Sequence, residues 1–463
     1  MVWGTVLPLQ PIILHPRPLQ RNGGSILLVP LLPYRKTATP LPTEIWTKIF
    51  ENVYYGDEVD PTPNVRRRAE QYRRDLLLVC KALTNIALPV FYSRVWIRSL
   101  WQLGRFTARL HAADKQWDSL RRIPYSAPGR WVRDLDLSGL DCGGIGLTVD
   151  ELLTRLFPLL PFMATFVLNT TMTLSRRALA ALTFRDGCHH LKSLKGIQAP
   201  ITQPINWQAH YPALTVDSDP LVQLIRNSDH LEEIEIHGPG FDSLEVDFAF
   251  QFTDVFSPVE LEGGEPVVQM NNPLKLNNLK SLSMLSTHAS PLMFALLLSE
   301  LPSLQRLAVT PYDDLPYPTS LVSKFIQIHG PTLRSLHLYT PKDTWPTISH
   351  PSPSDILLTC PILIHLSLEF PLPELKIPPG DVHPLQILSI PRPNQRCYQT
   401  VSTAVSSLKN LRIVRTRDVR WLRRGIISQA TETGTQGEMR QWKRRLALRG
   451  VCLLDTDMSR GND

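Results

Sequence analysis

The chain has 463 residues, of which 43% are hydrophobic and 20% charged, and its formal net charge is +7. This balance is ordinary for a folded protein and excludes a wholly disordered chain. The length allows two to four domains, or one small domain followed by a repeat array. Proline is unusually common, with 41 residues spread along the chain, which favours many short elements joined by turns over a few long helices.

The sequence shows none of the common motifs of catalytic, metal or cofactor sites. The six cysteines form no CxxC pair, so neither a zinc site nor a disulfide framework is expected, and free thiols indicate a reducing compartment, cytoplasmic or nuclear. The sequence holds no phosphate loop, dinucleotide fingerprint, HExxH, EF-hand loop or nucleophile elbow, the motifs that mark common catalytic and cofactor sites. We therefore predict no catalytic residue, no metal, no cofactor and no enzyme activity.

The first 40 residues are rich in proline and apolar side chains. The prolines interrupt every apolar run, so this segment fits neither a membrane span nor a signal peptide. Residues 1–40 are predicted to be a disordered leader.

Two amphipathic helices are predicted next. In the segment LPTEIWTKIFENV an apolar residue recurs at every fourth position, which gives one apolar stripe on a helix. The stripe consists of Leu41, Ile45, Ile49 and Val53, with Phe50 beside it. Pro42 suits a first helical turn. A second helical run covers 75–87, and Pro89 is expected to end it.

The order of three segments, LPTEIWTKIF, LLLVCKALTNIA and LPVFYSRVWI, resembles the F-box, especially the form found in fungal F-box proteins. The resemblance covers residues 41–97. The link at 54–74 is longer than in most relatives and carries five arginines, so it is predicted to be a solvated insertion.

The resemblance implies docking to the Skp-type adaptor of a cullin-based SCF ubiquitin ligase. Such an interface buries apolar anchors from a helix face, and a few central side chains carry most of its energy. Carried over position by position, the adaptor-binding residues are Leu41, Pro42, Ile45, Ile49, Phe50, Val79 and Cys80. Some of them are also expected to hold the core of the F-box itself.

A repeat follows a predicted linker at 98–130. Its pattern is apolar, two residues, apolar, one residue, apolar, which is typical of the short parallel strands of leucine-rich repeats. The copies are Val132/Leu135/Leu137, Met163/Phe166/Leu168, Leu191/Leu194/Gly196, Leu231/Ile234/Ile236, Leu279/Leu282/Met284, Leu304/Leu307/Val309, Leu333/Leu336/Leu338, Leu363/Leu366/Leu368, Leu385/Leu388/Ile390 and Leu408/Leu411/Ile413. A helical repeat would show longer runs of period 3.6.

The predicted fold class is therefore α/β: a small helical F-box followed, over 131–455, by a leucine-rich-repeat-like solenoid with a curved parallel sheet. Within each copy the apolar positions face the core and the residues between them line the open face. The central core positions include Leu135, Leu194, Ile234, Leu282, Leu307, Leu336, Leu366, Leu388 and Leu411. The open face is predicted to carry Asp136, Glu235, Ser283, Ala308, His337 and Ser367.

Two segments of unusual charge interrupt and close the array. The insertion at 237–277 is acidic, and Phe248, Phe250 and Phe252 alternate within it, which fits either a partner-binding loop or one buried strand face. The segment 412–449 is basic. It fits a solvated cap, with Met439, Trp442 and Leu446 on one helical stripe from Gly437 to Leu448, and a nucleic-acid surface is the alternative.

The working hypothesis is a substrate-recognition subunit of the ligase, with an unknown target protein on the solenoid surface. Transfer of ubiquitin would then be accelerated by proximity. The alternative is a non-catalytic scaffold or nucleic-acid-tethering protein that acts outside the ligase. No membrane partner is predicted.

Overall fold

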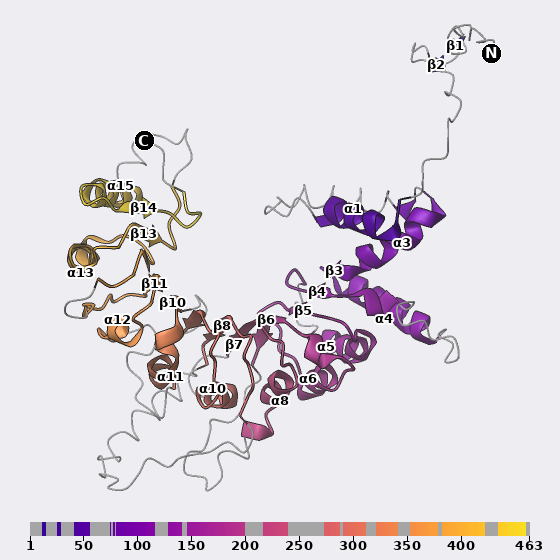
Figure 1. Cartoon of the computed structure of the whole chain (residues 1–463), viewed down its shortest axis with the longest axis horizontal. Helices are drawn as coiled ribbons and strands as arrows, with labels where there is room; N and C mark the ends of the chain where they lie inside the picture. The colour runs from indigo at the N-terminus through magenta and orange to yellow at the C-terminus, as the bar shows by residue number, and fades with distance from the viewer. Residues whose placement is uncertain are drawn as a thin grey trace, which may run out of the picture. The chain divides into compact units, whose positions relative to one another are not determined.

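The computed structural model describes residues 12–14, 26–28, 41–55, 75, 77–78, 80–115, 128–140, 146–199, 216–238, 273–287, 290–311, 321–340, 352–377, 382–421 and 434–459 (Figure 1). The chain divides into two compact units, residues 1–90 and residues 91–463. The predicted insertion at 54–74 lies almost wholly outside the described residues. So does most of the insertion at 237–277, including its three alternating phenylalanines.

Within residues 1–40 the structure describes only two short segments, and both are strands. β1 (Ile12–Leu14) and β2 (Ile26–Leu28) pair in antiparallel fashion. The prediction of a wholly disordered leader is wrong at these two segments, because each is a proline-free run of three apolar residues that can form ladder hydrogen bonds.

Two helices have defined bounds within the described residues of the first unit. α1 (Thr43–Tyr55) covers the predicted first helix. α3 (Lys81–Ser93) begins later than expected and runs through Pro89, so the prediction that this proline ends the helix is wrong. A proline inside a helix loses one backbone bond. Burial of Ala87 and Val90 on either side of it offsets that loss.

Aromatic packing holds these helices. The Phe50 ring stacks between the rings of Trp46 and Tyr54, at centroid distances of 6.1 and 5.9 Å. The hydroxyl of Tyr55 donates a 2.8 Å hydrogen bond to the carbonyl of Val90, which ties the end of α1 to α3. Phe50 and Tyr54 are both buried, so the side of α1 that carries these rings is its core side.

The second unit is built on a parallel sheet. In the described part of the chain it has twelve strands, and they lie side by side in sequence order from β3 to β14. This confirms the predicted α/β solenoid. The strands are β3 (Arg94–Trp96), β4 (Asp134–Asp136), β5 (Thr165–Val167), β6 (Ser193–Gln198), β7 (Glu233–His237), β8 (Ser281–Leu285), β9 (Arg306–Val309), β10 (Ser335–Leu338), β11 (His365–Ser367), β12 (Ile387–Ile390), β13 (Ile413–Thr416) and β14 (Cys452–Leu454).

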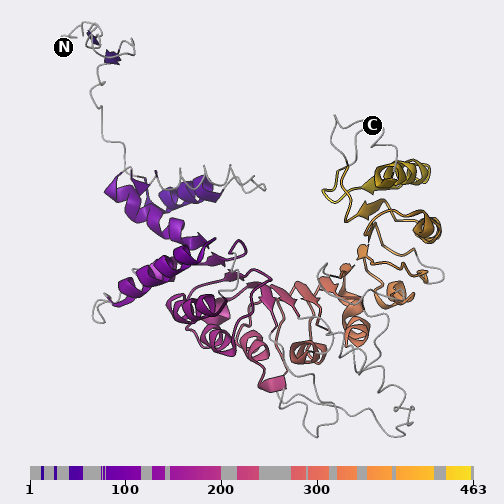
Figure 2. The same ribbon diagram turned by 180° about the vertical axis from the view of Figure 1, so that it is seen from behind.

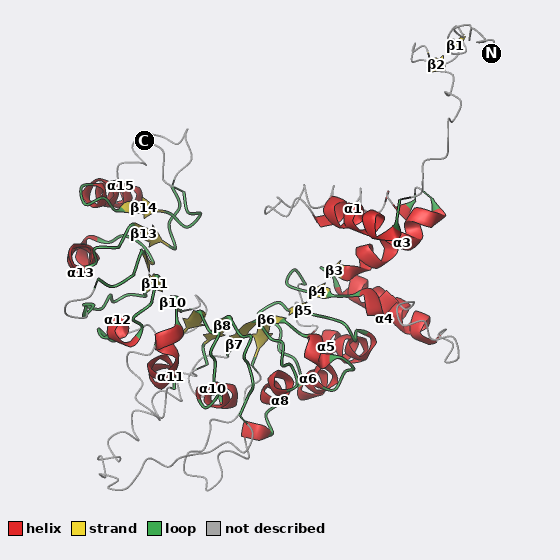
Figure 3. Cartoon of the chain, in the orientation of Figure 1, coloured by secondary structure: helices red, strands yellow, loops and turns green. Residues whose placement is uncertain are grey.

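Helices cover the outer side of this sheet and leave its inner, concave face to the strands (Figures 1, 2 and 3). They are α4 (Leu100–Lys115), α5 (Gly146–Leu156), α6 (Arg176–Thr183), α8 (Pro220–Arg226), α10 (Pro291–Leu297), α11 (Val322–His329), α12 (Ile356–Thr359), α13 (Gln395–Ser407) and α15 (Gly434–Ala447), with short 3-10 turns η1 (Pro128–Trp131), η2 (Phe157–Leu159), η3 (Cys188–His190) and η4 (Gly330–Thr332).

The predicted linker at 98–130 is wrong for its first half. α4 occupies 100–115 and buries Leu103 and Leu110 in the core of the repeat unit. The residues of its apolar side lie three and four apart, so the segment has the periodicity of a helix. Together with β3 it forms a first repeat, in which Tyr92, Val95 and Ile97 occupy the three apolar positions.

The strands are in register at one row of buried residues. The predicted core positions from Leu135 to Leu388 pair along the sheet and are all at most 2% exposed. The row then continues through Val414, which pairs with Leu388. The prediction placed Leu411 there and is wrong by three residues. Leu411 is buried too, but it occupies the first apolar position of its repeat, which corresponds to Leu385.

One backbone motif repeats from strand to strand and explains how long insertions leave the register intact. The carbonyl of Lys192 accepts hydrogen bonds from the backbone N–H groups of Glu232 and Glu233, at 2.7 and 3.1 Å. The carbonyl of Glu232 in turn accepts from Lys280 and Ser281. These bonds lie at the start of each strand, so an insertion at its other end does not disturb them.

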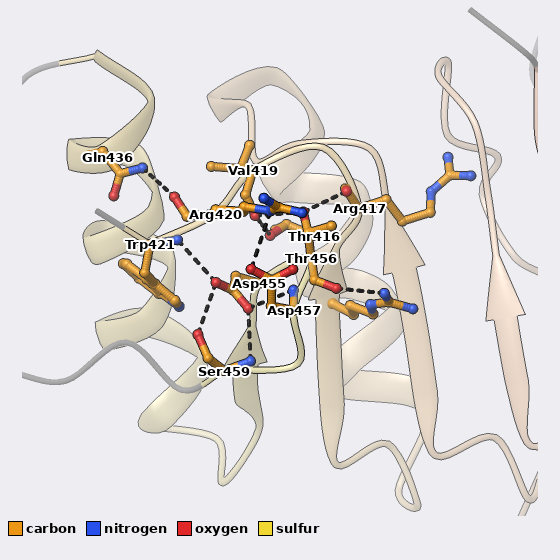
Figure 4. A network of polar contacts seen from close by, with 11 residues as sticks. Thr416, Arg417, Val419, Arg420, Trp421, Gln436, Asp455, Thr456, Asp457 and Ser459 are labelled. Atoms are coloured by element: carbon orange, nitrogen blue, oxygen red, sulfur yellow. Dashed lines mark hydrogen bonds and ion pairs between the residues drawn. The ribbon is translucent and has the colours of Figure 1, made fainter. Parts of the chain in front are cut away.

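The C-terminal end is closed by α15, β14 and a polar network (Figure 4). Met439, Trp442 and Leu446 are buried, which confirms the predicted apolar stripe of the cap. The Asp455 carboxylate accepts backbone hydrogen bonds from Trp421, Asp457 and Ser459, at 3.1, 3.0 and 2.8 Å. This network joins the segment after β13 to the segment after β14.

Candidate binding surfaces

α1 leaves an apolar stripe in water. The exposed fractions are 48% for Leu41, 44% for Ile45, 37% for Ile49 and 57% for Val53. Ile45, Ile49 and Val53 recur every four residues of α1, so they lie on one side of the helix, away from the buried rings of Phe50 and Tyr54. Leu41 lies just before the first residue of the helix and extends the same spacing. A regular exposed apolar row of this kind is a feature of interaction surfaces.

The other predicted adaptor-binding residues divide into three cases. Pro42 and Cys80 are exposed, and Val79 lies outside the described residues. Phe50 is 4% exposed and offers no surface to a partner in this structure. Its place is in the core, because adjacent residues of a helix point about 100° apart and Phe50 therefore faces away from the exposed Ile49.

The second surface is a hollow of about 310 Å³ on the concave face of the sheet, here called the central hollow. It lies over β6 to β10. Its polar lining consists of Lys195, Glu233, Glu235, Ser281, Ser283, Arg306 and His337. Glu235, Ser283, Ala308 and His337 had been predicted to line the open face, and the structure places all four there.

Two ion ladders run across the strands in and beside the central hollow. The carboxylate of Glu233 contacts Lys195 Nζ at 2.6 Å and Arg306 Nη2 at 3.1 Å. At the start of the strands, the carboxylate of Glu232 contacts Lys280 Nζ at 2.8 Å and Lys192 Nζ at 3.9 Å. Each glutamate therefore forms ion pairs with two cations from different repeats.

These cations shift the titration of the glutamates. The hydrogen bond from Lys195 lowers the pKa of Glu233, against the opposing effect of partial burial. The hydrogen bond and charge of Lys280 lower the pKa of Glu232. Both carboxylates are thus ionised in a locally positive field.

A chain of histidines and serines continues the concave face. Ser335 Oγ lies 2.8 Å from His337 Nε2, and His365 Nε2 lies 2.8 Å from Ser389 Oγ. The two histidine rings meet edge to face, with their centroids 4.5 Å apart. Burial, reinforced by nearby arginines, lowers the pKa of each histidine to about 4, so both are neutral at neutral pH.

The face is closed beyond these histidines. Arg417, which follows β13, donates to the Glu369 carboxylate at 2.7 Å and to the Leu368 carbonyl at 2.9 Å. Its guanidinium also lies over the ring of Tyr339. Ser367, predicted to line the open face, is fully buried. Ser367 pairs in register with His337, but the prediction that it lines the open face is wrong, because no part of it is exposed.

Part of the basic C-terminal segment is used inside the cap. Arg415 donates to the Thr456 carbonyl at 2.7 Å, Arg420 pairs with Asp457 at 3.2 Å, and Arg449 donates to the Ser402 carbonyl at 2.7 Å. Arg445 lies over the Tyr398 ring. These contacts support the interpretation of a structural cap over that of a nucleic-acid surface.

Two absences hold within the described ranges. No helix there is both long and apolar enough to cross a membrane. No group of three or more histidine, cysteine, aspartate or glutamate side chains there is arranged to hold a metal ion.

No protein-family model matches the chain. No curated protein matches it either. Among solved structures, a protein from Bacteroides fragilis is similar at 12% identity and a TM-score of 0.26, over 76% of this chain and 73% of that one. The yeast complex of Rad7 and Elc1 is similar at 12% identity and a TM-score of 0.26, over 84% of this chain and 94% of that one. Likenesses this weak carry no argument, so the fold assignment stands on the sheet register and the buried rows.

Proposed function

We propose that this protein is a substrate-recognition subunit of an SCF-type cullin ubiquitin ligase, acting in the cytoplasm or nucleus. In this proposal α1 docks on the Skp-type adaptor, and the concave face of the repeat unit holds a target protein. The observation that carries it is the exposed row Leu41, Ile45, Ile49 and Val53, in the segment whose sequence resembles the F-box.

The exposed row has the form that helix-in-groove recognition needs. Apolar side chains at every fourth position can enter a complementary groove while the opposite side of the helix stays in its own core. The Trp46, Phe50 and Tyr54 rings fix the orientation of α1, so the row is presented without a rearrangement that would cost affinity.

The chain contributes no chemical step in this proposal. Holding the target beside the ubiquitin-conjugating partner raises its effective concentration, and that alone accelerates transfer. The repeat unit suits this role because its strands form a continuous face whose side chains come from many repeats.

The decisive test is adaptor binding by the full-length chain. Ile45→Asp places a charge in the exposed row, where docking would bury it without a partner. We expect co-purification with a Skp-type adaptor to fall at least about tenfold. Glu51→Lys, a charge change on the same helix outside the row, should bind like the wild type.

Circular dichroism and thermal unfolding separate loss of docking from loss of fold. Ile45 is 44% exposed, so its replacement should leave both measurements unchanged. Failure of the wild-type chain to bind the adaptor would refute the proposal and favour a scaffold acting outside the ligase. Equal binding by Ile45→Asp would refute the role of the exposed row.

A further inference from the structure

Positive charge is in excess along the concave face. From β6 to β13 the strands, with the single residue before each, carry seven lysines and arginines against three glutamates. The cations are Lys192, Lys195, Lys280, Arg306, Arg334, Arg412 and Arg415, and the carboxylates are Glu232, Glu233 and Glu235. Charges from repeats far apart in the sequence thus gather on one surface.

Part of this excess lies in and beside the central hollow: Lys195 and Arg306 line it, and Lys192 and Lys280 lie at the start of the neighbouring strands. Four of the cations share only the two carboxylates of Glu232 and Glu233. Glu235 is engaged by the ring of His237 at 3.0 Å. The four cations in and beside the hollow therefore exceed the three carboxylates of Glu232, Glu233 and Glu235 by one. Lys192, Lys280 and Arg306 remain 60, 57 and 58% exposed in their side chains, so a ligand can reach them.

The titration of neighbouring groups agrees with this geometry. The pKa of His337 is lowered by burial first and then by the positive charges of Arg417, Arg415 and Arg306. Arg306 and Lys195 likewise help to lower the pKa of Glu233. Both groups therefore lie in a net positive field from several repeats.

The floor of the central hollow is lined by small side chains. Ser281, Ser283 and Ala308 lie between the charged residues of β6 and β7 and the Arg306 side chain of β9. Small residues allow a peptide backbone to come close to the sheet. Strands lie about 4.8 Å apart, so β6 and β9 are separated by about 14 Å, the length of roughly four extended residues.

We infer that the concave face binds an extended, acidic segment of a partner protein, with its carboxylates on Lys195, Lys280 and Arg306. The inference deepens the proposed function, since this segment would belong to the target protein, but its chemistry can be measured without the adaptor. Carboxylates spaced about four residues apart would contact the cations of β6 and β9 together. A peptide can place its charges at such intervals and avoid Glu233, whereas the closely spaced phosphates of nucleic acid cannot.

The test uses the full-length chain and a fluorescent peptide of about ten residues in which glutamate alternates with glycine and serine. Anisotropy should report binding that weakens as salt is raised, because the contacts are ionic. A matched peptide with glutamine in place of glutamate should not bind. A phosphoserine version shows whether phosphate is preferred to carboxylate on the same cations, and single-stranded DNA is the competing class of ligand.

Variants that remove a positive or a negative charge from the surface should change binding in opposite directions. The double variant Lys280→Gln and Arg306→Gln should weaken binding about tenfold, and Arg155→Gln, a 64% exposed cation of α5 on the outer side, should not change it. Glu233→Gln should strengthen binding, because it frees Lys195 and Arg306 for the ligand. A merely structural role for Glu233 would predict the reverse.

The possible outcomes are distinct. No salt-sensitive binding of the acidic peptide, or weaker binding by a folded Glu233→Gln variant, overturns the inference. Glu232→Gln provides a second variant of the same sign if the first unfolds. Tighter binding of DNA than of peptide would replace the partner class. Adaptor binding by the same preparation is measured separately, so failure here leaves the proposed function standing and failure there leaves this inference standing.

Discussion

The two units differ in how far they bury a regular row of apolar side chains. In the repeat unit the core row is complete, and Leu336 on β10 is fully buried between its neighbours on β9 and β11. On α1 of the first unit, Ile45 is 44% exposed although it belongs to an equally regular apolar row. Stacked repeats supply each strand with a partner on both sides. In the described part of the first unit, no second copy of α1 is stacked against its row, which stays partly exposed to water.

The surfaces differ correspondingly in chemistry. The apolar row of α1 would gain free energy by leaving water. The concave face offers ionic contacts that set specificity and respond to salt. The two proposed interactions would therefore differ in kind, with apolar burial for the adaptor and charge for the target segment.

The largest difference in stability between a buried and an exposed position is expected for two neighbouring residues of α1. Phe50→Ala removes a buried ring that stacks with two others, and we expect it to cost about 3–5 kcal/mol and to unfold the helices of the first unit. Ile49→Ala changes a partly exposed residue and should cost much less. Hydrogen exchange of residues 43–93 measures both, and similar protection in the two variants would contradict the assigned core side of α1.

In the repeat unit the same comparison sets Leu336 against Ile328. Leu336→Ala should reduce the free energy of unfolding by about 2–5 kcal/mol, because it opens a cavity in a fully buried row. Ile328→Ala, on α11 with the side chain 48% exposed, should change it by about 0.5 kcal/mol or less. Chemical denaturation provides the measurement, and equal losses would show that the outer helices carry the stability instead.

The polar cap gives a smaller effect with a defined dependence on pH. Burial alone would raise the pKa of Asp455, but hydrogen bonds from Trp421, Ser459 and Asp457 outweigh it and lower the pKa. Its contribution is therefore present above the unfolded pKa and lost as the pH falls through the folded value. Asp455→Asn should cost about 1.5–3 kcal/mol at neutral pH and little at strongly acidic pH. A constant cost across this range would show that the charge is not what matters.

The smallest effect is expected from the histidine pair of the concave face. His337 and His365 have a pKa of about 4 in the folded chain against an ordinary value of 6.5. The unfolded chain therefore binds more protons between these values, so stability should fall as the pH is lowered from 6.5 to 4. Allowing for their coupling and partial exposure, the loss is about 1–2 kcal/mol.

The double variant His337→Gln and His365→Gln should flatten that decline. His111→Gln, which changes an exposed histidine of α4, should leave it unchanged. Stability measured by denaturation at several pH values distinguishes the two. A decline that persists in the double variant would assign it to other groups.

Local sequence determined the regular part of this fold. The LxxLxL spacing predicted strands β4 to β12 and most of their buried row, because alternating side chains of a strand point to opposite faces whatever surrounds them. The stripe of Met439, Trp442 and Leu446 predicted the closing helix for the analogous reason of helical periodicity.

Tertiary structure decided the remainder. β14 lacks the repeat pattern and is a strand because the neighbouring repeat supplies the hydrogen-bonding edge. Leu411 and Val414 both fit an apolar position, and only pairing with β12 selects Val414. The ladder of Lys195, Glu233 and Arg306 spans more than a hundred residues of sequence. Its members share no local period, and only the stacking of four strands brings their charges within contact distance.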